Sequence, residues 1–268
     1  MLKKYDLVFG LGAACSCSQA VRRAGLQHLS FPNDWCGPDI WDNEHLPLEH
    51  DFRMRVDALV SKFEHHFDAG DFVNTGERGD KYLYRNRRTH CVLSHDFPKS
   101  VPFESALKAA EEKYRRRTER LFSLLREARH VLVVRIDRPD RPLPTPDDDC
   151  RYVLDRLSET FPQAEFHLVE FLFEKGLDFD RRRVETVADG WLRVSYDYHD
   201  YTPGKEPLET RIDLNARILA ELFEVCDYRT PDEHRRHELE RRKRRYAKYN
   251  ATNWWQYQLA RLISKLKR

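Results

Sequence analysis

Short apolar runs alternate with amphipathic segments along the first 226 residues. The apolar runs of strand length cover residues 5–11, 131–136, 165–172 and 191–196. The segments in which apolar residues recur every three or four positions cover residues 15–24, 103–128, 150–161 and 208–226. Continuous apolar runs are typical of strands buried in a parallel sheet, and the three- to four-residue spacing indicates one face of a helix. This alternation predicts a three-layer α/β fold, with a mostly parallel sheet and flanking helices.

The region between residues 26 and 98 has weaker patterns. Residues 50–67 are expected to form a helix, and residues 82–84 and 90–93 two short strands. Proline, glycine and polar residues indicate loops at 26–48 and 74–80. The loop at 26–48 follows the first predicted helix and is expected to form one wall of a pocket over it.

The first strand and helix are joined by a tight turn at Gly12, which places Cys15 at the start of the helix. Unpaired backbone N–H groups and the helix dipole favour a thiolate at that position. Alternatively, Cys15 is a small buried residue in a tight corner. Cys17 is an alternative nucleophile, but it would point about 200° away from Cys15 around the helix. Only one of the two thiols is therefore expected to face a pocket.

Histidines and carboxylates follow other predicted strands. His95 and Asp96 come directly after residues 90–93, and His199 follows the strand that ends at residue 196. Because ligands of open parallel sheets gather beyond the carboxyl ends of the strands, these groups are expected to converge with Cys15. Cys15 would be the nucleophile, His95 or alternatively His199 the base, and Asp96 or Asp34 the group that orients it.

Four further residues are candidates for substrate binding. Trp35 either stacks on a substrate or closes the edge of the core. Arg117 and Arg120 border the apolar stripe of the helix at 103–128, where they form either an anion clamp or part of an ion-paired, solvated face. Arg135, inside a predicted strand, is expected to contribute to substrate binding as well.

Several motifs occur in one order between residues 5 and 136. They are Leu11-Gly12-x-x-Cys15, Arg22-x-x-Gly25-Leu26, Ser30-x-Pro32-x-Asp34-Trp35, Ser94-His95-Asp96-Phe97 and Tyr114-x-Arg116-Arg117-x-x-Arg120-Leu121-Phe122. Together they resemble a bacterial family described as papain-like cysteine peptidases, and the resemblance implies a Cys-His site. Asn33 departs from the family pattern, which has a second aromatic residue before Asp34.

The predicted element order differs from that of papain itself, whose first half is mainly helical. A strand, a loop and a helix that begins with the nucleophile instead suit esterases and acyltransferases. We therefore expect a thiol-dependent acyl-transfer enzyme, a hydrolase or a transferase, with a peptide, glycan or small-molecule substrate. A hydrolase of this kind needs no cofactor, whereas a transferase would take coenzyme A as its acyl carrier.

Composition supports one folded domain with an appendage. Of the 268 residues, 40% are hydrophobic and 34% are charged. Residues 229–268 carry 13 Lys or Arg and four Asp or Glu, a net charge of +9. Since the whole chain carries +2, residues 1–228 carry about −7. The expected division is therefore an α/β domain at 1–228 and a basic helical tail at 229–268.

The cysteines and histidines indicate the compartment and the metal content. Six scattered cysteines without a CxxC pair are typical of reduced thiols in a cytoplasmic protein. His65 and His66 are adjacent, so they point to different faces of a helix, and no carboxylate or cysteine stands four residues after either of them. No metal site is expected. No apolar run reaches the length needed to cross a membrane.

The predicted tail combines a basic block at 241–245 with an amphipathic helix after residue 253. The positions expected to enter a membrane interface are Trp254, Trp255, Leu259, Leu262, Ile263 and Leu266. A basic, aromatic, amphipathic helix binds anionic membranes, so a peripheral location on the inner face of the membrane is expected. Alternatively, the helix docks on its own domain or on a dimer partner.

The tail also motivates two alternative functions. Similar basic, aromatic tails occur on bacterial enzymes of surface polysaccharides, which favours an acyltransferase or related transferase of cell-surface polysaccharide biosynthesis as the second enzyme hypothesis. A non-enzymatic nucleic-acid-binding or membrane-binding module is the third. Nucleic acid is disfavoured as a partner, because the body is acidic and has no recognisable nucleic-acid-binding motif.

Overall fold

A computed structural model of the chain describes residues 3–38, 51–89, 91–137, 145–197 and 207–225. His199 and the predicted tail at 229–268 lie outside the described residues. The predictions made for them, including the membrane-binding positions, therefore remain predictions.

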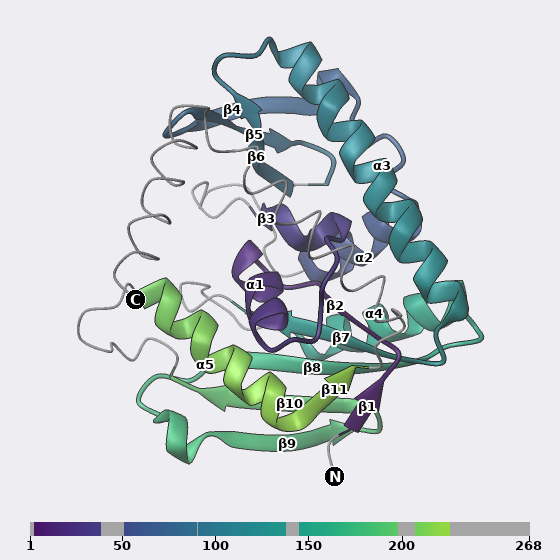
Figure 1. Ribbon diagram of the computed structural model, residues 1–268, viewed down its shortest axis with the longest axis vertical. Helices are drawn as coiled ribbons and strands as arrows, with labels where there is room; N and C mark the ends of the chain where they lie inside the picture. Colours follow the sequence, from purple (N-terminus) through teal and green to yellow (C-terminus); the bar gives the residue numbers. More distant parts are fainter. Residues whose placement is uncertain (1–2, 39–50, 90, 138–144, 198–206, 226–268) are drawn as a thin grey trace, which may run out of the picture. The chain divides into compact units, whose positions relative to one another are not determined.

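A five-stranded sheet forms the middle layer of the fold (Figure 1). Its order is β2 (Leu7–Gly10), β7 (His130–Ile136), β8 (Glu165–Phe173), β10 (Trp191–Tyr196) and β9 (Arg183–Ala188). The first four strands are parallel, and β9 pairs antiparallel with β10 at the edge. The prediction of a mostly parallel sheet is confirmed.

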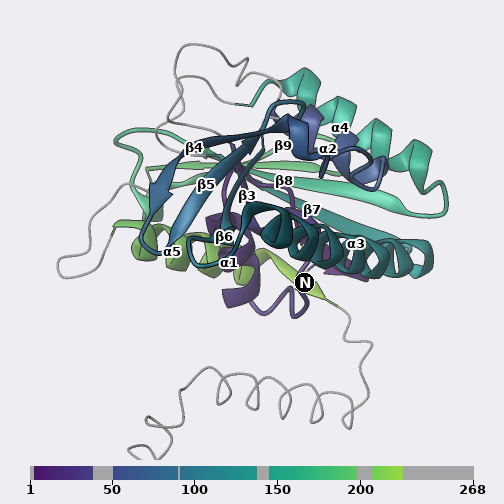
Figure 2. The same ribbon diagram turned by 90° about the horizontal axis from the view of Figure 1, so that it is seen from above.

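Helices cover both faces of this sheet. The helices are α1 (Cys15–Arg23), α2 (Asp51–Val60), α3 (Phe103–Glu127), α4 (Asp147–Thr160) and α5 (Pro207–Leu222). Residues of α1 and α5 share one apolar core with the sheet, and residues of α2, α3 and α4 share the other. Figure 2 shows α4 and α5 on opposite sides of the strands. The predicted α/β architecture with flanking helices is therefore confirmed.

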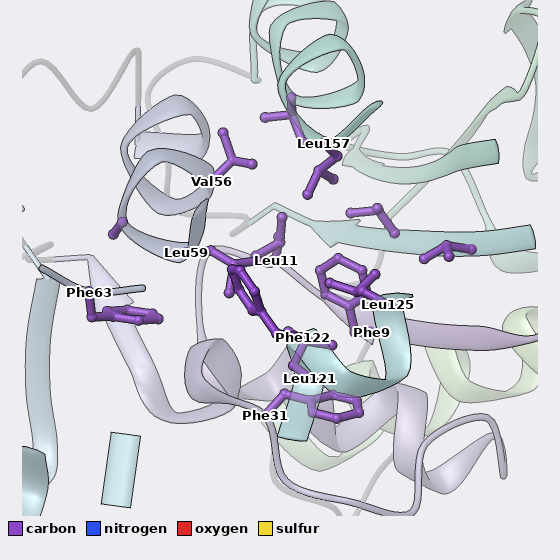
Figure 3. Close-up of a cluster of buried hydrophobic side chains, with 14 of the residues drawn as sticks. Phe9, Leu11, Phe31, Val56, Leu59, Phe63, Leu121, Phe122, Leu125 and Leu157 are labelled. Carbon is purple, nitrogen blue, oxygen red and sulfur yellow. The ribbon is translucent and has the colours of Figure 1, made fainter. Parts of the chain in front are cut away.

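The larger core joins elements that are distant in sequence (Figure 3). Phe9 of β2 packs with Leu59 of α2, Leu125 of α3 and Leu157 of α4. Leu11, just past the end of β2, belongs to the same cluster and is fully buried. Burying the residue that enters the turn before Cys15 fixes the direction in which the chain leaves the strand.

A second, antiparallel sheet was not predicted. Its order is β3 (Cys36–Pro38), β6 (Cys91–Pro98), β5 (Lys81–Asn86) and β4 (Phe72–Arg78). Residues 74–78 of β4 were predicted as part of a polar loop, and the structure shows that they are exposed. Its hydrogen bonds to β5 make it a strand, which a pattern of buried positions cannot reveal. The inner residues Leu93 and Phe97 join the core of the first sheet.

Several element boundaries also differ from the prediction. The first apolar run is divided at Asp6, whose carboxylate accepts the N–H groups of Arg129 and His130 at 2.7 and 2.9 Å. The residues before the break form β1 (Lys3–Tyr5), which pairs in parallel with β11 (Phe223–Val225). The predicted helix at 208–226 therefore ends at Leu222 and continues as a strand.

Three short 3₁₀ helices complete the described elements: η1 (Pro32–Trp35), η3 (Ala69–Asp71) and η4 (Phe179–Arg181). η1 contacts α1, α2, α3 and β6. It therefore lies where the first helix, the long helix and the second sheet meet.

Candidate active site

The turn between β2 and α1 is held against the neighbouring strand. The N–H groups of Leu11 and Ala13 donate to the carbonyl oxygens of Val134 and Ile136 at 2.9 and 3.2 Å. A Cβ atom on Gly12 would lie 2.1 Å from Cβ of Cys17, so only glycine fits this close approach. The fixed turn places Cys15 as the first residue of α1.

The amino end of α1 carries no side-chain cap. Ala14 occupies the cap position in an extended conformation, and no acidic residue lies in the first turn. The first N–H groups of a helix have no partners within the helix, so this end carries partial positive charge. The thiol of Cys15 lies at this positive end.

Solvent reaches Cys15 but not Cys17, Cys91 or Cys150. Cys15 is partly exposed, whereas Cys17, Cys91 and Cys150 are buried. The thiol of Cys17 donates to the carbonyl oxygen of Val134 at 3.4 Å, and burial raises its pKa to about 12. Cys17 is therefore not a competing nucleophile.

Residues one turn along the helix share the face of Cys15. Nε2 of Gln19 lies 3.8 Å from Sγ of Cys15. Oγ of Ser18 lies 3.1 Å from the carbonyl oxygen of Cys15 and 2.9 Å from that of Asp34. Ser18 thus joins the start of α1 to η1. The sequence-based prediction missed both residues, although their spacing of three and four from Cys15 was the available signal.

Asp34 organises η1 from within. Its carboxylate accepts hydrogen bonds from Arg22, from Gln27 at 2.9 Å and from the N–H of Phe31 at 2.8 Å. Burial raises the pKa of this carboxyl group, while Arg22 and Gln27 oppose the shift. These donors occupy the carboxylate that was expected to orient the base. No hydrogen bond between Asp34 and His95 is present in the described part of the chain.

The sequence predicted His95 at a strand terminus. In the structure it lies inside β6. Tyr82 of β5 pairs with Phe97 of β6, and Tyr84 pairs with Leu93. An advance of two residues along β5 therefore corresponds to four residues along β6. His95 therefore falls in an irregular, bulged part of the strand. Bulges re-aim side chains and occur often beside active sites. Because this sheet is separate from the parallel one, the expected convergence of strand ends does not apply to His95.

The ring of Trp35 joins His95 to the first helix. The centroids of the Trp35 and His95 rings are 5.2 Å apart, edge to face. The guanidinium of Arg22, a residue of α1, lies 5.6 Å from the centre of the Trp35 ring. Cys15 and His95 are thus on elements that both adjoin η1, but no hydrogen bond joins Sγ of Cys15 to the His95 ring among the described residues.

Charge surrounds His95 on several sides. Burial, followed by the positive charges of Lys81, Arg78 and Lys113, lowers its pKa. Asp96 forms an ion pair with Lys113 of α3 and its side chain is only 2% exposed. Asp96 was expected to orient its neighbour His95. These contacts do not show that role, because the side chains of adjacent strand residues point to opposite faces.

The two arginines of α3 reach the same region. Arg117 and Arg120 are half-buried, in the orientation that the helical pattern predicts. The positive charge of Arg117 lowers the pKa of the Asp34 carboxyl group, opposing the effect of burial. Nη1 of Arg120 donates to the carbonyl oxygen of Ser30 at 3.2 Å. Both residues therefore support the chain just before and within η1. Their role in substrate binding remains a prediction.

Arg135 does not face a substrate pocket in the way expected. It is fully buried and donates to Asp51 and Asp137 at 2.9 Å each and to the carbonyl oxygen of Leu11 at 3.0 Å. Although burial by itself lowers the pKa of Arg135, Asp51 and Asp137 raise it above its usual value. Arg135 is therefore a structural anchor beneath the turn. Arg55 of α2 supports the same turn through the carbonyl oxygen of Ala13 at 3.4 Å.

Asn33 was noted only as a departure from the family pattern, but it is unusual in the structure. It is 5% exposed, and neither Oδ1 nor Nδ2 has a hydrogen-bond partner in the described part of the chain. Nε1 of Trp35 is likewise buried without a described partner. Buried polar groups of this kind are uncommon and point to an additional binding partner.

Comparison with known proteins adds no assignment. No protein-family model matches the chain, and no curated protein or solved structure matches it either. Within the described residues, no helix is long and apolar enough to cross a membrane. The same residues contain no group of three or more His, Cys, Asp or Glu arranged to hold a metal ion.

Proposed function

We propose that the protein is a thiol-dependent acyl-transfer enzyme with Cys15 as the nucleophile. One observation carries the proposal: Cys15 is the partly exposed thiol at the uncapped amino end of α1, while its neighbour Cys17 is buried. The N–H groups at that end are suitable donors to the oxyanion that forms when a thiolate attacks a carbonyl.

His95 is the proposed base. Because burial and nearby cations lower its pKa, the imidazole is neutral at neutral pH and able to accept the thiol proton. Trp35 holds the ring beside η1 at 5.2 Å between centroids. Since hydrogen bonds of unliganded sites are often long, we expect the substrate to complete the approach of the two residues.

The proposed reaction has two halves. In the first, the Cys15 thiolate attacks the acyl carbonyl carbon, the bond to the leaving group breaks, and imidazolium returns the proton to that group. A thioester on Cys15 results. In the second, His95 takes a proton from an acceptor hydroxyl, which attacks the thioester and releases the thiol. Water as the acceptor makes the enzyme a hydrolase; a glycan hydroxyl makes it a transferase.

A transferase of this class could draw its acyl group from coenzyme A, and a surface polysaccharide is the acceptor suggested by the predicted tail. A peptide substrate is the alternative suggested by the resemblance to papain-like peptidases. These choices differ in the acceptor and donor, but all of them require the same cysteine.

Acylation by p-nitrophenyl acetate tests the proposal. We expect a burst of p-nitrophenol, stoichiometric with the protein, and a modification of Cys15 identified by fragmentation of the peptide that contains both Cys15 and Cys17. Cys15→Ser should lower the burst rate by at least about 100-fold. Cys17→Ala is the matched control, because its thiol is buried, and it should keep the burst. Full activity in Cys15→Ala would refute the proposal.

A further inference from the structure

We propose that the Cys15 site takes an acyl substrate that carries an anionic group, a carboxylate or a phosphate. This inference rests on acyl transfer at Cys15 and names the class of substrate. It is carried by the charges gathered around Trp35 and His95, by two buried carboxylates that pair with Arg22 and Lys113, and by buried polar groups without partners among the described residues.

Cations approach His95 from three elements. Arg78 ends β4, Lys81 begins β5 and Lys113 lies on α3, and the positive charge of each acts on the His95 ring. Arg78 and Lys81 pair across one hairpin turn, and Lys113 is distant from them in the chain, so the fold brings α3 and this hairpin together around His95. The cations around the His95 ring attract an anionic ligand and repel a cationic one.

Further cations lie beside Trp35 and η1. Arg22 contacts that ring and donates to Oγ of Ser30 at 3.1 Å, while Arg117 and Arg120 adjoin Asp34 and Ser30. Arginine binds carboxylate and phosphate through two parallel hydrogen bonds. An arginine already fixed by a buried acid loses little side-chain entropy when it binds a ligand.

The two acids that pair with cations of this region are buried, and their partners are partly exposed. The side chains of Asp34 and Asp96 are 0% and 2% exposed, whereas those of their partners Arg22 and Lys113 are 27% and 26% exposed. The more exposed member of each of these two ion pairs is therefore the cation, although residues 1–228 are acidic as a whole.

The buried amide of Asn33 is an independent observation at the same element. Its side chain and Nε1 of Trp35 have no hydrogen-bond partners in the described part of the chain. Leaving such groups unpaired costs about 1–3 kcal/mol each, so a bound water or a ligand group is expected to supply the missing bonds. Both residues belong to η1, and the Trp35 ring lies near Arg22 of α1 and the His95 ring.

A pair of alkylating reagents that differ in charge tests this inference. Iodoacetate and iodoacetamide have nearly the same size, but only iodoacetate is an anion. We expect the ratio of their rates at Cys15 to exceed the ratio for a small neutral thiol by about threefold or more. This excess should decrease as sodium chloride is added, because salt screens exposed charges.

Matched variants locate the charges responsible. Arg78→Gln combined with Lys81→Gln should lower the rate ratio toward that of the small thiol. Arg129→Gln is the control, because Arg129 precedes β7 at the amino edge of the sheet, whereas Cys15 follows the carboxyl end of the parallel strand β2. Since iodoacetamide reacts in every variant, its rate reports whether the site is still folded.

Protection experiments distinguish the two anionic groups. Inorganic phosphate and succinate are compared as inhibitors of iodoacetamide labelling at equal ionic strength, with chloride as the reference. Slower labelling with phosphate alone would assign a phosphate, and with succinate alone a carboxylate. A rate ratio equal to that of the small thiol, or one unchanged by the Arg78 and Lys81 substitutions, would overturn the inference while leaving acyl transfer intact. Failure of Cys15 to react faster than a small thiol with either reagent would instead remove the proposed function.

Discussion

Cys15 and Cys17 lie on different sides of helix α1, and solvent reaches only the first thiol. The environment of each follows from one geometric fact: Cys17 packs against the turn at Gly12, so Cys15 is directed away from the sheet. The same turn aligns α1 with its amino end beside the Cys15 thiol. At the scale of single residues, the reactivity of the site therefore depends on which of two similar side chains the sheet buries.

His95 makes a pH prediction at this scale. Its pKa is lowered, so the imidazole stays neutral down to a lower pH than a free histidine, and the acid limb of the acylation rate should lie below about pH 6.5. Lys81→Glu replaces a repelling cation with an anion and should move the limb up by about half a unit or more. The pH profile of the p-nitrophenyl acetate burst gives the acid limb of the wild type and of the variant. Arg129→Glu is the control and should leave the acid limb in place. A wild-type limb above pH 6.5 would contradict the role assigned to His95.

At the scale of elements, the site depends on how β2, the turn and α1 are joined. The turn passes so close to α1 that an added methyl group has no room, and its carbonyl oxygens are held from below by Arg55 and Arg135. β6 contributes His95 from a different sheet through a bulge. The β2–α1 turn thus positions Cys15, and the bulge in β6 positions His95.

Gly12→Ala tests the close approach. The new Cβ would lie 2.1 Å from Cβ of Cys17 and 2.6 Å from its Sγ, so α1 or the turn must move. We expect the free energy of unfolding to fall by about 3 kcal/mol, the upper part of the usual range for overpacking, and labelling of Cys15 to slow. Urea denaturation and the iodoacetamide rate measure the two effects.

Gly70→Ala is the matched control for this substitution, because nothing lies within 4 Å of a Cβ placed at Gly70. Its stability should change by less than about 0.5 kcal/mol. Equal stability of the Gly12→Ala variant and the wild type would show that the turn is not as tightly packed as its distances imply.

At the scale of the whole molecule, a buried ionic cluster ties the turn to the sheet and to α2. Arg135 bridges Asp51 at the start of α2 and Asp137 after β7, and it also binds the carbonyl oxygen of Leu11. Thr145 adds a hydroxyl that lies 2.8 Å from Asp137. Because the cluster connects three segments that are distant in sequence, its loss would affect the domain and not a single contact.

Arg135→Gln should therefore lower stability strongly. The substitution leaves two buried carboxylates without their shared counterion, which typically costs about 3–5 kcal/mol. Arg115→Gln, which removes an exposed i,i+4 ion pair with Glu119, should cost less than about 0.5 kcal/mol. Chemical denaturation of the two variants tests the contrast. A stable Arg135→Gln protein with weakened substrate binding would restore the original assignment of Arg135 to the substrate.

The predicted tail leads to a test of membrane association. The full chain should sediment with vesicles that contain phosphatidylglycerol, because basic residues meet anionic lipid and the aromatic face enters the interface. A chain that ends at Tyr249 lacks the six apolar positions and should remain in solution. Vesicles of phosphatidylcholine alone are the control for charge. Equal sedimentation of the two chains with the anionic vesicles would remove the membrane hypothesis.

Sequence patterns were sufficient for elements whose own residues set their burial. The helix predicted at 103–128 is α3 (Phe103–Glu127), and the run at 131–136 is β7 (His130–Ile136). In both, apolar periodicity reports directly which side faces a core, since burial follows from the hydrophobic effect. The position of Cys15 at the start of a helix was predictable for the same reason, together with the glycine turn.

The tertiary structure alone decided the partners of polar and exposed residues. β4 is a strand because β5 lies beside it, Arg135 is a structural residue because Asp51 and Asp137 surround it, and His95 is in a separate sheet. Hydrogen bonds and ion pairs between distant segments are not encoded in local periodicity, because any suitable donor in the chain can supply them. The sequence by itself thus determined the layers of the fold and the place of the thiol, while the tertiary contacts decided which charges surround it.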